Sequence, residues 1–253
     1  MRYVRFQKGA VERYGVLEKD KIWEIKGDPF GAFIVTQESY ALNEVKLLAP
    51  VLPSKLVCVG LNYRDHAREM NEPLPKEPLI FIKPSTAVIG PEEVIRRPRQ
   101  SQRVDYEAEL AVVVKKRARN VPLERASEYI LGYTCANDVT ARDLQKSDGQ
   151  WTRAKSFDTF APLGPAIVDE IDPHHLKIEA YLNGQRKQSS STEQLIFSPE
   201  ELLSFISGIM TLLPGDVILT GTPSGVGPML AGDEIEIVIE GIGSIKNTVA
   251  NAD

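Results

Sequence analysis

Three carboxylates occupy alternate positions in the stretch VDYEAELAVVV, residues 104–114, where a polar start runs directly into an apolar segment. Because side chains alternate along a β-strand, Asp105, Glu107 and Glu109 are predicted to share one face. Like charges this close raise one another's pKa unless a positive charge lies among them. Glu107 and Glu109 are about 7 Å apart along the strand, so their side chains can converge on one ion. The alternatives are a solvated strand face or pairing with lysines.

The type of metal follows from the type of ligand. Oxygen-only ligands suit a hard cation such as Mg²⁺, Mn²⁺ or Ca²⁺. A third oxygen is expected from Asp138, which lies in ANDVTARD, residues 136–143, directly after an apolar strand. The two cysteines, Cys58 and Cys135, lie in apolar segments without a CxxC pairing, so they indicate buried reduced thiols rather than a zinc site.

Three further polar side chains have the chemistry to hold substrate oxygens. Lys155 lies where the chain turns apolar, and a lysine near carboxylates and a metal can hold an enolate or carboxylate oxygen. Arg142 and Gln145 follow Asp138 by four and seven positions, on one face of a helix start. Arg142 can clamp a carboxylate through two hydrogen bonds. The alternatives are a surface lysine and a salt bridge from Arg142 to Asp138 or Asp143.

A histidine and a glycine-rich loop complete the set of candidates. His66 and Glu69 stand three residues apart on a predicted short helix, a spacing that lets the carboxylate orient the ring as a general base or water activator. A helix-surface ion pair is the alternative. The segment 214–228 contains no GK[ST], so it is not a P-loop, but such a loop can present N–H groups and the Thr222 hydroxyl to an anion. A tight turn is the simpler interpretation of this loop.

The elements that must position these residues are mainly strands. Residues 1–50 read as short strands and turns, and the prolines of APVLPS, residues 49–54, mark a boundary near residue 52. We predict a small N-terminal domain over 1–52 and a larger domain over 53–253. Predicted features of the second domain are a helix capped by Asn62, a helix over PLERASEYI, a helix with Ser198 as cap and Pro199 at its first position, and an Asn-Gly hairpin turn in LNGQ, 182–185.

The composition excludes several classes of protein. Of the 253 residues 42% are hydrophobic and 26% are charged, as in ordinary globular chains. The net charge of −5 argues against a nucleic-acid partner. We find no apolar run of 18 residues and no signal-peptide pattern, so no membrane partner is expected. Together with the reduced cysteines, this predicts a cytoplasmic protein.

Six motifs in one order resemble the fumarylacetoacetate hydrolase family over roughly residues 52–250. They are GLNYRDHAREM, FIKPSTAVIGP, VDYEAELAVVV, GYTCANDVTARDLQ, AKSFDTFAPLGP and LTGTPSGVGP. The resemblance implies that Glu107, Glu109 and Asp138 hold Mg²⁺ or Mn²⁺, with Ca²⁺ possible in vitro, and that Lys155 is catalytic. The first motif resembles acylpyruvases and oxaloacetate decarboxylases, in which a His and a Glu, here His66 and Glu69, lie on a mobile lid.

The resemblance also implies a fold and a reaction. The expected fold is a strand-rich mixed α/β structure, a rolled β-sandwich with few helices plus a small N-terminal β-rich domain, and members usually form homodimers. The expected substrate is a small-molecule 2-oxo acid bound through Arg142, Gln145 and Thr222. A metal-stabilised enolate would serve acylpyruvate C–C hydrolysis and oxaloacetate decarboxylation. The alternatives are a 2-hydroxyhepta-2,4-diene-1,7-dioate isomerase or the decarboxylase of its 5-carboxylated precursor, 5-carboxymethyl-2-oxo-hex-3-ene-1,7-dioate, and a non-catalytic metal-binding β domain.

Overall fold

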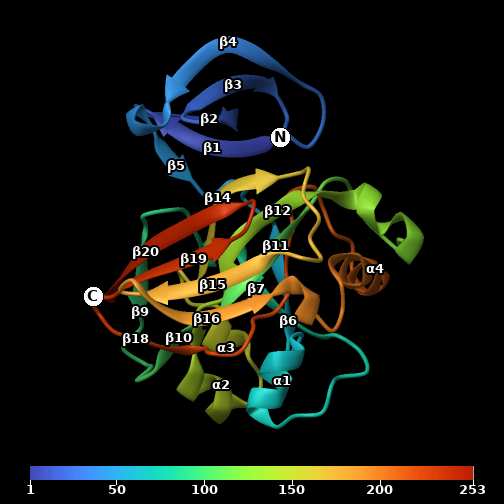
Figure 1. Cartoon of the computed structure of the whole chain (residues 1–253), viewed down its shortest axis with the longest axis vertical. Helices are drawn as coiled ribbons and strands as arrows, with labels where there is room; N and C mark the ends of the chain where they lie inside the picture. Colours follow the sequence, from blue (N-terminus) through green and yellow to red (C-terminus); the bar gives the residue numbers. More distant parts are fainter. Residues whose placement is uncertain (253) are drawn as a thin grey trace.

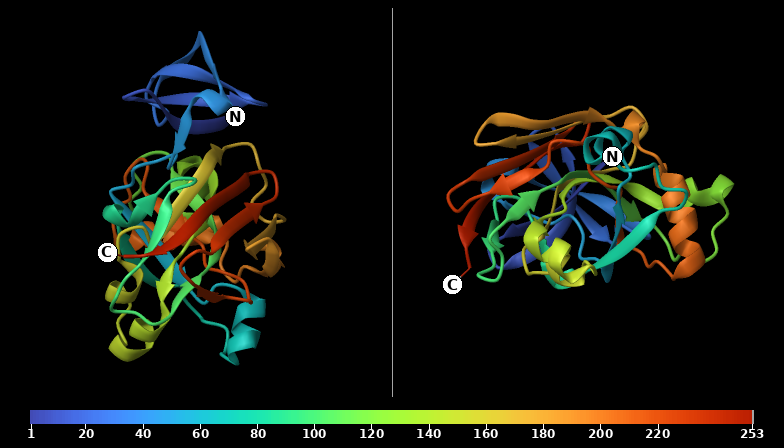
Figure 2. Two further views of the ribbon diagram at one scale, coloured as in Figure 1. Left: turned by 90° about the vertical axis from the view of Figure 1, so that its left-hand side faces the viewer. Right: turned by 90° about the horizontal axis from the view of Figure 1, so that it is seen from below.

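The computed structural model describes residues 1–252, which form an elongated, strand-rich molecule (Figure 1). The N-terminal strands lie at one end of the long axis. The short helices α1 (Arg64–Met70), α2 (Arg142–Asp148) and α3 (Thr152–Lys155) lie at the other end, and two perpendicular views show the same arrangement (Figure 2). The predicted fold class, a strand-rich mixed α/β structure with few helices and an N-terminal β region, is confirmed.

A large sheet runs the length of the molecule, in the order β4-β3-β2-β1-β14-β12-β11-β17-β6-β7, with β5 pairing with β1 and β8 with β14. Its strands are β1 (Arg2–Lys8), β2 (Val11–Glu18), β3 (Lys21–Gly27), β4 (Phe33–Ala41), β5 (Lys46–Leu48), β6 (Lys55–Gly60), β7 (Leu79–Pro84), β8 (Val88–Ile89), β11 (Ala108–Val114), β12 (Ile130–Asn137), β14 (Ala161–Val168) and β17 (Val217–Leu219). Because β1 pairs with both β5 and β14, sheet hydrogen bonding continues across the predicted boundary at residue 52. The division into two domains stays a prediction.

Two smaller sheets complete the fold of the described residues, and the five-stranded one packs against β11, β12 and β14 of the large sheet. The first has the order β16-β15-β19-β20-β9 and the second the order β13-β10-β18. Their strands are β16 (Gln185–Ser191), β15 (Lys177–Leu182), β19 (Glu234–Ile239), β20 (Gly243–Asn251), β9 (Val94–Arg97), β13 (Thr140–Ala141), β10 (Val104–Tyr106) and β18 (Gly227–Met229). The predicted hairpin turn joins β15 to β16, with positive φ angles of 52° at Asn183 and 74° at Gly184, as a type I′ turn requires.

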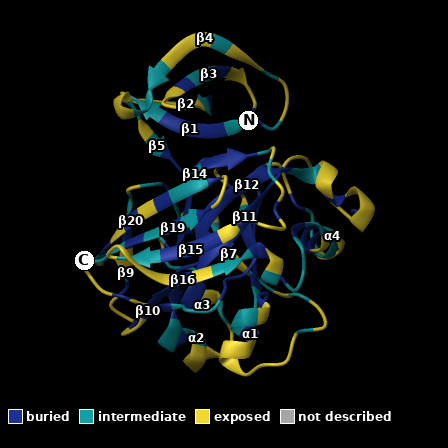
Figure 3. Cartoon of the chain, in the orientation of Figure 1, coloured by how far each residue is buried: buried dark blue, intermediate teal, exposed yellow. Residues whose placement is uncertain are grey.

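Strand β11 separates two layers of the core. Leu110, Val112 and Val114 pack into one hydrophobic cluster, and Ala111 and Val113 pack into another on the opposite face. Every residue of β11 is buried, and the dark core in Figure 3 follows this strand and its neighbour β12. Apolar side chains on both faces are expected in a strand that is covered on both sides.

The helices confirm one predicted cap and correct another. Helix α4 (Pro199–Ile209) begins with the predicted Ser198 cap, completed by Glu201 as a capping box. The predicted cap at Asn62 is wrong, because α1 starts at Arg64 and the buried Asn62 amide instead donates to the carbonyls of Phe197 and Thr220. The predicted helix over PLERASEYI is the 3₁₀-helix η3. The 3₁₀-helices are η1 (Leu42–Glu44), η2 (Ser85–Ala87), η3 (Leu123–Tyr129) and η4 (Thr192–Gln194).

Candidate active site

A cavity of about 560 Å³ opens at the end of the molecule that carries α1, α2 and α3. It gathers all the candidate site residues except Glu69. The predicted residues that line it are His66, Glu107, Glu109, Asp138, Arg142, Gln145, Lys155 and Thr222. Residues from motifs more than 100 positions apart therefore share one surface.

The three candidate ligands are held at the junction of the sheets. Glu107 lies between β10 and β11, and its N–H donates to the Asn137 side-chain oxygen at 2.9 Å. Asp138 follows β12, and its N–H donates to the Glu107 carbonyl at 2.9 Å. One carboxylate oxygen from each of Glu107, Glu109 and Asp138 lies within 4.8 Å of the other two. All three are buried, which rules out the solvated strand face but leaves lysine pairing in place.

The surroundings separate the charge states of the two glutamates. Burial would raise the pKa of Glu107, but the ammonium of Lys155 and the guanidinium of Arg142 outweigh burial and lower this pKa to about 2. For Glu109, burial and the negative charges of Asp138 and Glu107 raise the pKa well above its usual range. Its direct partner is the Gly221 N–H, at 2.7 Å. Among the three acids Glu107, Glu109 and Asp138, which we call the acid triad, the negative charge of Glu109 is therefore poorly compensated, as a cation site requires.

Lys155 is a buried lysine and not a surface residue. Its side chain is 3% exposed, and its Nζ donates to Glu107 Oε2 at 2.9 Å and to Asp138 Oδ2 at 2.6 Å. Burial would lower the pKa of Lys155, but the charges of Asp138 and Glu107 prevail and raise it. The ammonium is therefore charged at neutral pH and acts as a donor of hydrogen bonds.

Arg142 contacts two acids that sequence spacing did not predict, together with Gln145 on the same helix face. Its Nε donates to Asp105 Oδ2 at 3.0 Å, its Nη1 donates to Gln145 Oε1 at 2.7 Å, and its Nη2 contacts Glu107 Oε1. The alternative salt bridges to Asp138 and Asp143 are absent from the part of the chain that the structure describes. Gln145 thus helps to orient Arg142 and also lines the cavity.

The dyad of His66 and Glu69 is present on α1. His66 Nδ1 lies 2.9 Å from Glu69 Oε2, and the Gly225 N–H donates to Glu69 Oε1 at 3.1 Å. With Nδ1 engaged by the carboxylate, Nε2 is the ring nitrogen left for other chemistry. Helix α1 is also tied to β16, because the Ser190 hydroxyl donates to Asp65 Oδ2 at 2.5 Å. The helix that carries the dyad is thus docked over the cavity.

The glycine-rich loop contributes a hydroxyl at the cavity wall. The Gln188 amide donates to Thr222 Oγ1 at 2.9 Å and to the Pro223 carbonyl at 2.8 Å, which fixes the loop. Gly221 has a φ of +93°, and a Cβ there would lie 2.8 Å from the Asn62 side chain. Glycine is required at this position so that the backbone N–H can reach Glu109.

Sequence reasoning missed several residues of the site. Lys83 on β7 is fully buried and donates to Asp138 Oδ1 at 2.5 Å. Trp151 and Phe81 meet edge to face and line the cavity, and the exposed Arg103 and Lys146 stand at its mouth. A lysine inside the apolar strand LIFIKP was the available signal for Lys83. No local pattern indicated the other four.

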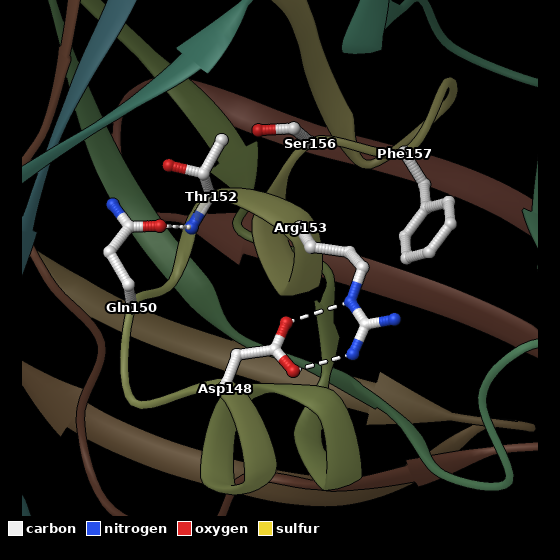
Figure 4. A pocket seen from close by; sticks show the side chains of 6 residues that line it. All are labelled: Asp148, Gln150, Thr152, Arg153, Ser156 and Phe157. Atoms are coloured by element: carbon white, nitrogen blue, oxygen red, sulfur yellow. Dashed lines mark hydrogen bonds and ion pairs between the residues drawn. The ribbon is translucent and has the colours of Figure 1, made fainter.

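A second hollow, of about 520 Å³, is lined by residues of α2, of α3 and of the segments next to α3 (Figure 4). Thr152, Arg153 and Ser156 of the α3 region face it, whereas Trp151 and Lys155, four positions apart, face the candidate site. Arg153 is occupied by Asp148, with its Nε donating at 2.7 Å. This hollow contains no predicted site residue, so the chemistry belongs to the other cavity.

Comparison with known proteins gives the class. Residues 55–250 match the family model for the fumarylacetoacetate (FAA) hydrolase C-terminal domain, and residues 1–50 match the Rv2993c-like N-terminal model. The chain belongs to the fumarylacetoacetate hydrolase family, as its motifs indicated, and is an enzyme of that family. No helix within residues 1–252 has the length and apolar character needed to cross a membrane.

Three relatives illustrate the range of the family. The chain is 49% identical over 220 residues to a mitochondrial oxaloacetate tautomerase of Bos taurus, covering 82% of this chain and 70% of the bovine one. A 2-hydroxyhepta-2,4-diene-1,7-dioate isomerase from Mycobacterium marinum is 44% identical, with a TM-score of 0.93 over 99% and 98% of the two chains. A maleylpyruvate hydrolase from Sphingobium sp. SYK-6, in complex with manganese(II) and pyruvate, is 29% identical, with a TM-score of 0.84 over all of both chains.

The donor set fits a hard divalent cation. Three buried carboxylates supply only oxygen atoms, and burial together with the charges of Asp138 and Glu107 raises the pKa of one of them, Glu109. Mg²⁺ and Mn²⁺ prefer such ligands. A possible divalent-metal site of three acidic residues is therefore a feature of this chain.

Proposed function

We propose that this enzyme interconverts the enol and keto forms of a small 2-oxo dicarboxylic acid, with a divalent cation held by Glu107, Glu109 and Asp138. The observation that carries this proposal is His66, oriented by Glu69, above a cavity that also holds the three acids and Lys155. Relatives of 44% and 49% identity are an isomerase and a tautomerase, whereas a fumarylacetoacetate hydrolase from Exiguobacterium antarcticum is 37% identical and the maleylpyruvate hydrolase 29% identical. Proton transfer is therefore favoured over the hydrolysis that the motifs alone favoured.

The other groups around the cavity leave His66 as the candidate for proton transfer. Asp105, Glu107 and Asp138 are each held by cationic side chains, and Lys155 is a charged donor. When bound, a divalent cation polarises the 2-oxo group and makes the adjacent carbon more acidic. His66 Nε2 would move the proton at C3, and Lys155 Nζ would donate a hydrogen bond to the enol oxygen. Gln145 and Thr222 would orient the carboxylate next to the 2-oxo group.

The mouth of the cavity favours a second carboxylate on the substrate. Arg103 shares two hydrogen bonds with Asp105, through Nε at 2.9 Å and Nη2 at 3.2 Å, which leaves its Nη1 available. Lys146 has no acidic partner among residues 1–252 and lies exposed at the last turn of α2. A substrate that ends in a carboxylate would meet these two cations, whereas an acylpyruvate with a methyl end would not.

A second candidate reaction is C–C hydrolysis of an acylpyruvate, and the same dyad favours it. In that case His66 would take a proton from water rather than from carbon. Oxaloacetate decarboxylation needs no such base, because carbon dioxide leaves without a nucleophile. The three reactions thus differ in how strongly they depend on His66.

The test follows the enol absorbance of oxaloacetate and of acetylpyruvate with Mg²⁺, with and without EDTA, while pyruvate is measured in parallel. We expect metal-dependent loss of enol-oxaloacetate without pyruvate, at a rate reduced at least about 100-fold in His66→Ala. Metal-dependent cleavage of acetylpyruvate would select hydrolysis. Pyruvate release from oxaloacetate that persists in His66→Ala would select decarboxylation. Activity that survives EDTA in all assays would contradict a metal-dependent reaction.

A further inference from the structure

A fully buried lysine lies behind the acid triad and has no part in the proposed reaction. Lys83 is 0% exposed and donates to Asp138 Oδ1 at 2.5 Å and to the Val139 carbonyl at 3.1 Å. Its Nζ also lies 5.9 Å from the centre of the Phe160 ring. Burial of an ammonium is costly unless charged and hydrogen-bonding partners surround it. The position therefore has a specific requirement for this side chain.

The two oxygens of Asp138 have different lysine partners. Oδ1 accepts from Lys83, and Oδ2 accepts from Lys155 at 2.6 Å. Lys155 lines the cavity, whereas Lys83 does not. Lys155 also contacts Glu107, so it faces two candidate ligands and the cavity at once. Lys83 contacts one candidate ligand from the protein side.

We propose that Lys83 is a positioning residue of the metal site. It fixes Asp138 through Oδ1, so that Oδ2 is presented to the cation when Lys155 turns to the substrate. The inference rests on the proposed function, because it takes Asp138 as a metal ligand. Hydrogen bonds from surrounding groups to ligating carboxylates commonly set metal affinity by 10–100-fold.

The strand that carries Lys83 supports this role. Leu79, Phe81 and Lys83 alternate along β7 and share one face, and the first two line the cavity. The Phe81 ring centre lies 5.0 Å from Lys155 Nζ. The hydrogen bonds from Lys83 to Asp138 and Val139 therefore anchor the wall of the cavity to the end of β12, where the ligand is.

A simpler interpretation makes a different prediction. If Lys83 only neutralises the acids, its removal takes a positive charge away from the cation and should strengthen metal binding by about tenfold or more, by Coulomb's law. If it positions Asp138, removal of the donor should weaken binding. The sign of the change in metal affinity separates the two.

The experiment titrates Mn²⁺ into EDTA-treated, dialysed protein by calorimetry. We expect Lys83→Met to bind Mn²⁺ about 10–100-fold more weakly, and Lys83→Gln, which keeps an N–H donor without the charge, to stay within about threefold of wild type by the same reasoning. Lys55→Met is the matched control, because Lys55 lies on the neighbouring strand β6 and pairs with the buried Asp216 outside the site. It should lower thermal stability but leave the Mn²⁺ affinity unchanged.

The outcomes are distinct. Tighter binding in both variants, unchanged binding in Lys83→Met, or equal losses in Met and Gln would overturn the positioning role. If Lys83→Met does not fold, Lys83→Gln alone decides. A Mn²⁺ affinity of Lys83→Gln that differs tenfold from wild type, in either direction, contradicts the inference. A wild-type chain that binds no Mn²⁺ overturns both this inference and the proposed function. Mn²⁺ binding without tautomerase activity overturns only the latter.

Discussion

Among the single residues of the site, the acidic side chains differ in how many cationic side chains contact them. Glu107 contacts Arg142 and Lys155, and Asp138 contacts Lys83 and Lys155, whereas Glu109 has no cationic side chain in contact among the described residues. A cation bound among these acids would supply the charge that Glu109 lacks. This asymmetry has a measurable consequence for stability.

The stability of the metal-free protein should fall as pH rises above about 5. The folded-state pKa of Glu109 is raised by burial and by Asp138 and Glu107, so the folded chain holds a proton that the unfolded chain releases first. The stability that this proton provides is lost as pH rises towards the raised pKa, by up to about 1.4 kcal/mol per pH unit. The lowered pKa of Glu107 affects the stability only below the usual pKa of a glutamate. The raised pKa of Lys155 affects the stability only above the usual pKa of a lysine.

Urea unfolding of EDTA-treated protein between pH 5 and 8 checks this sign. Saturating Mg²⁺ should remove the decline, because binding requires Glu109 to be ionised. Glu109→Gln is the control and should show no decline attributable to this site. A metal-free protein whose stability rises steadily over the same range would contradict the assignment.

A second prediction at the residue scale concerns the cavity mouth. Lys146→Ala should raise the KM for a 2-oxo dicarboxylate about tenfold, since it removes a charged contact worth roughly 1–2 kcal/mol. The KM for acetylpyruvate, which lacks the second carboxylate, should stay unchanged. Lys116→Ala, on the exposed surface away from the cavity, is a control for general loss of charge. Equal effects on both substrates would show that Lys146 does not select for a second acid group.

At the scale of elements, the cavity depends on close packing between β6 and the segment that joins α2 to α3. A Cβ on Gly60 would lie 2.7 Å from the Trp151 ring, so the ring occupies the space that any larger residue at position 60 would fill. Trp151 in turn packs edge to face against Phe81 on β7, with ring centres 5.2 Å apart. One glycine thus sets the position of an aromatic wall built from two strands and a loop.

Gly60→Ala should therefore push Trp151 into the cavity. We expect a loss of about 1–3 kcal/mol in stability from overpacking and a clear rise in KM, while Mn²⁺ affinity changes little because the acids lie on other elements. Thermal unfolding, steady-state kinetics and Mn²⁺ titration measure the three effects. Gly208→Ala on α4 is the control, as nothing lies within 4 Å of its added Cβ. An unchanged KM in Gly60→Ala would contradict a role for Trp151 in forming the cavity.

At the scale of the whole molecule, prediction from sequence succeeded where the information was local. The alternation of Glu107 and Glu109, the Ser198 cap and the Asn183–Gly184 turn each depend on neighbours in the chain. The Asn62 cap failed because a buried amide found carbonyls at Phe197 and Thr220, more than 130 positions away.

The pairing of the charged side chains could not be predicted for the same reason. Lys83 and Asp138 are 55 positions apart, and Arg142 and Asp105 are 37 apart. A short stretch of sequence, on which local patterns depend, therefore never contains both members of either pair. Their contacts exist only because β7, β10 and β12 meet at one end of the sheets. The family motifs identified the participants, and the fold assigned their partners.

The N-terminal strands lie at the opposite end of the molecule from the helices α1, α2 and α3 (Figure 1), whose residues line part of the cavity. β1 pairs with β14, and its buried Val4 and Phe6 pack with Ala166. Deletion of residues 1–50 would remove Val4 and Phe6, uncover the apolar residues Leu163, Ala166 and Ile167 of β14 that share buried clusters with the deleted strands, and leave an edge of β14 open, but it would remove no residue that lines the cavity. The shortened chain should therefore keep its metal site and lose stability.

We expect the melting temperature to fall by about 10 °C or more, because each uncovered large side chain contributes about 1.5–3 kcal/mol and a chain of this size loses about 2–4 °C per kcal/mol. The Mn²⁺ affinity of the soluble fraction should stay within about threefold of the full chain. A shortened protein that melts at the same temperature would establish residues 1–52 as an independent domain. One that keeps its stability but loses Mn²⁺ binding would show instead that the N-terminal strands shape the distant site through the shared sheet.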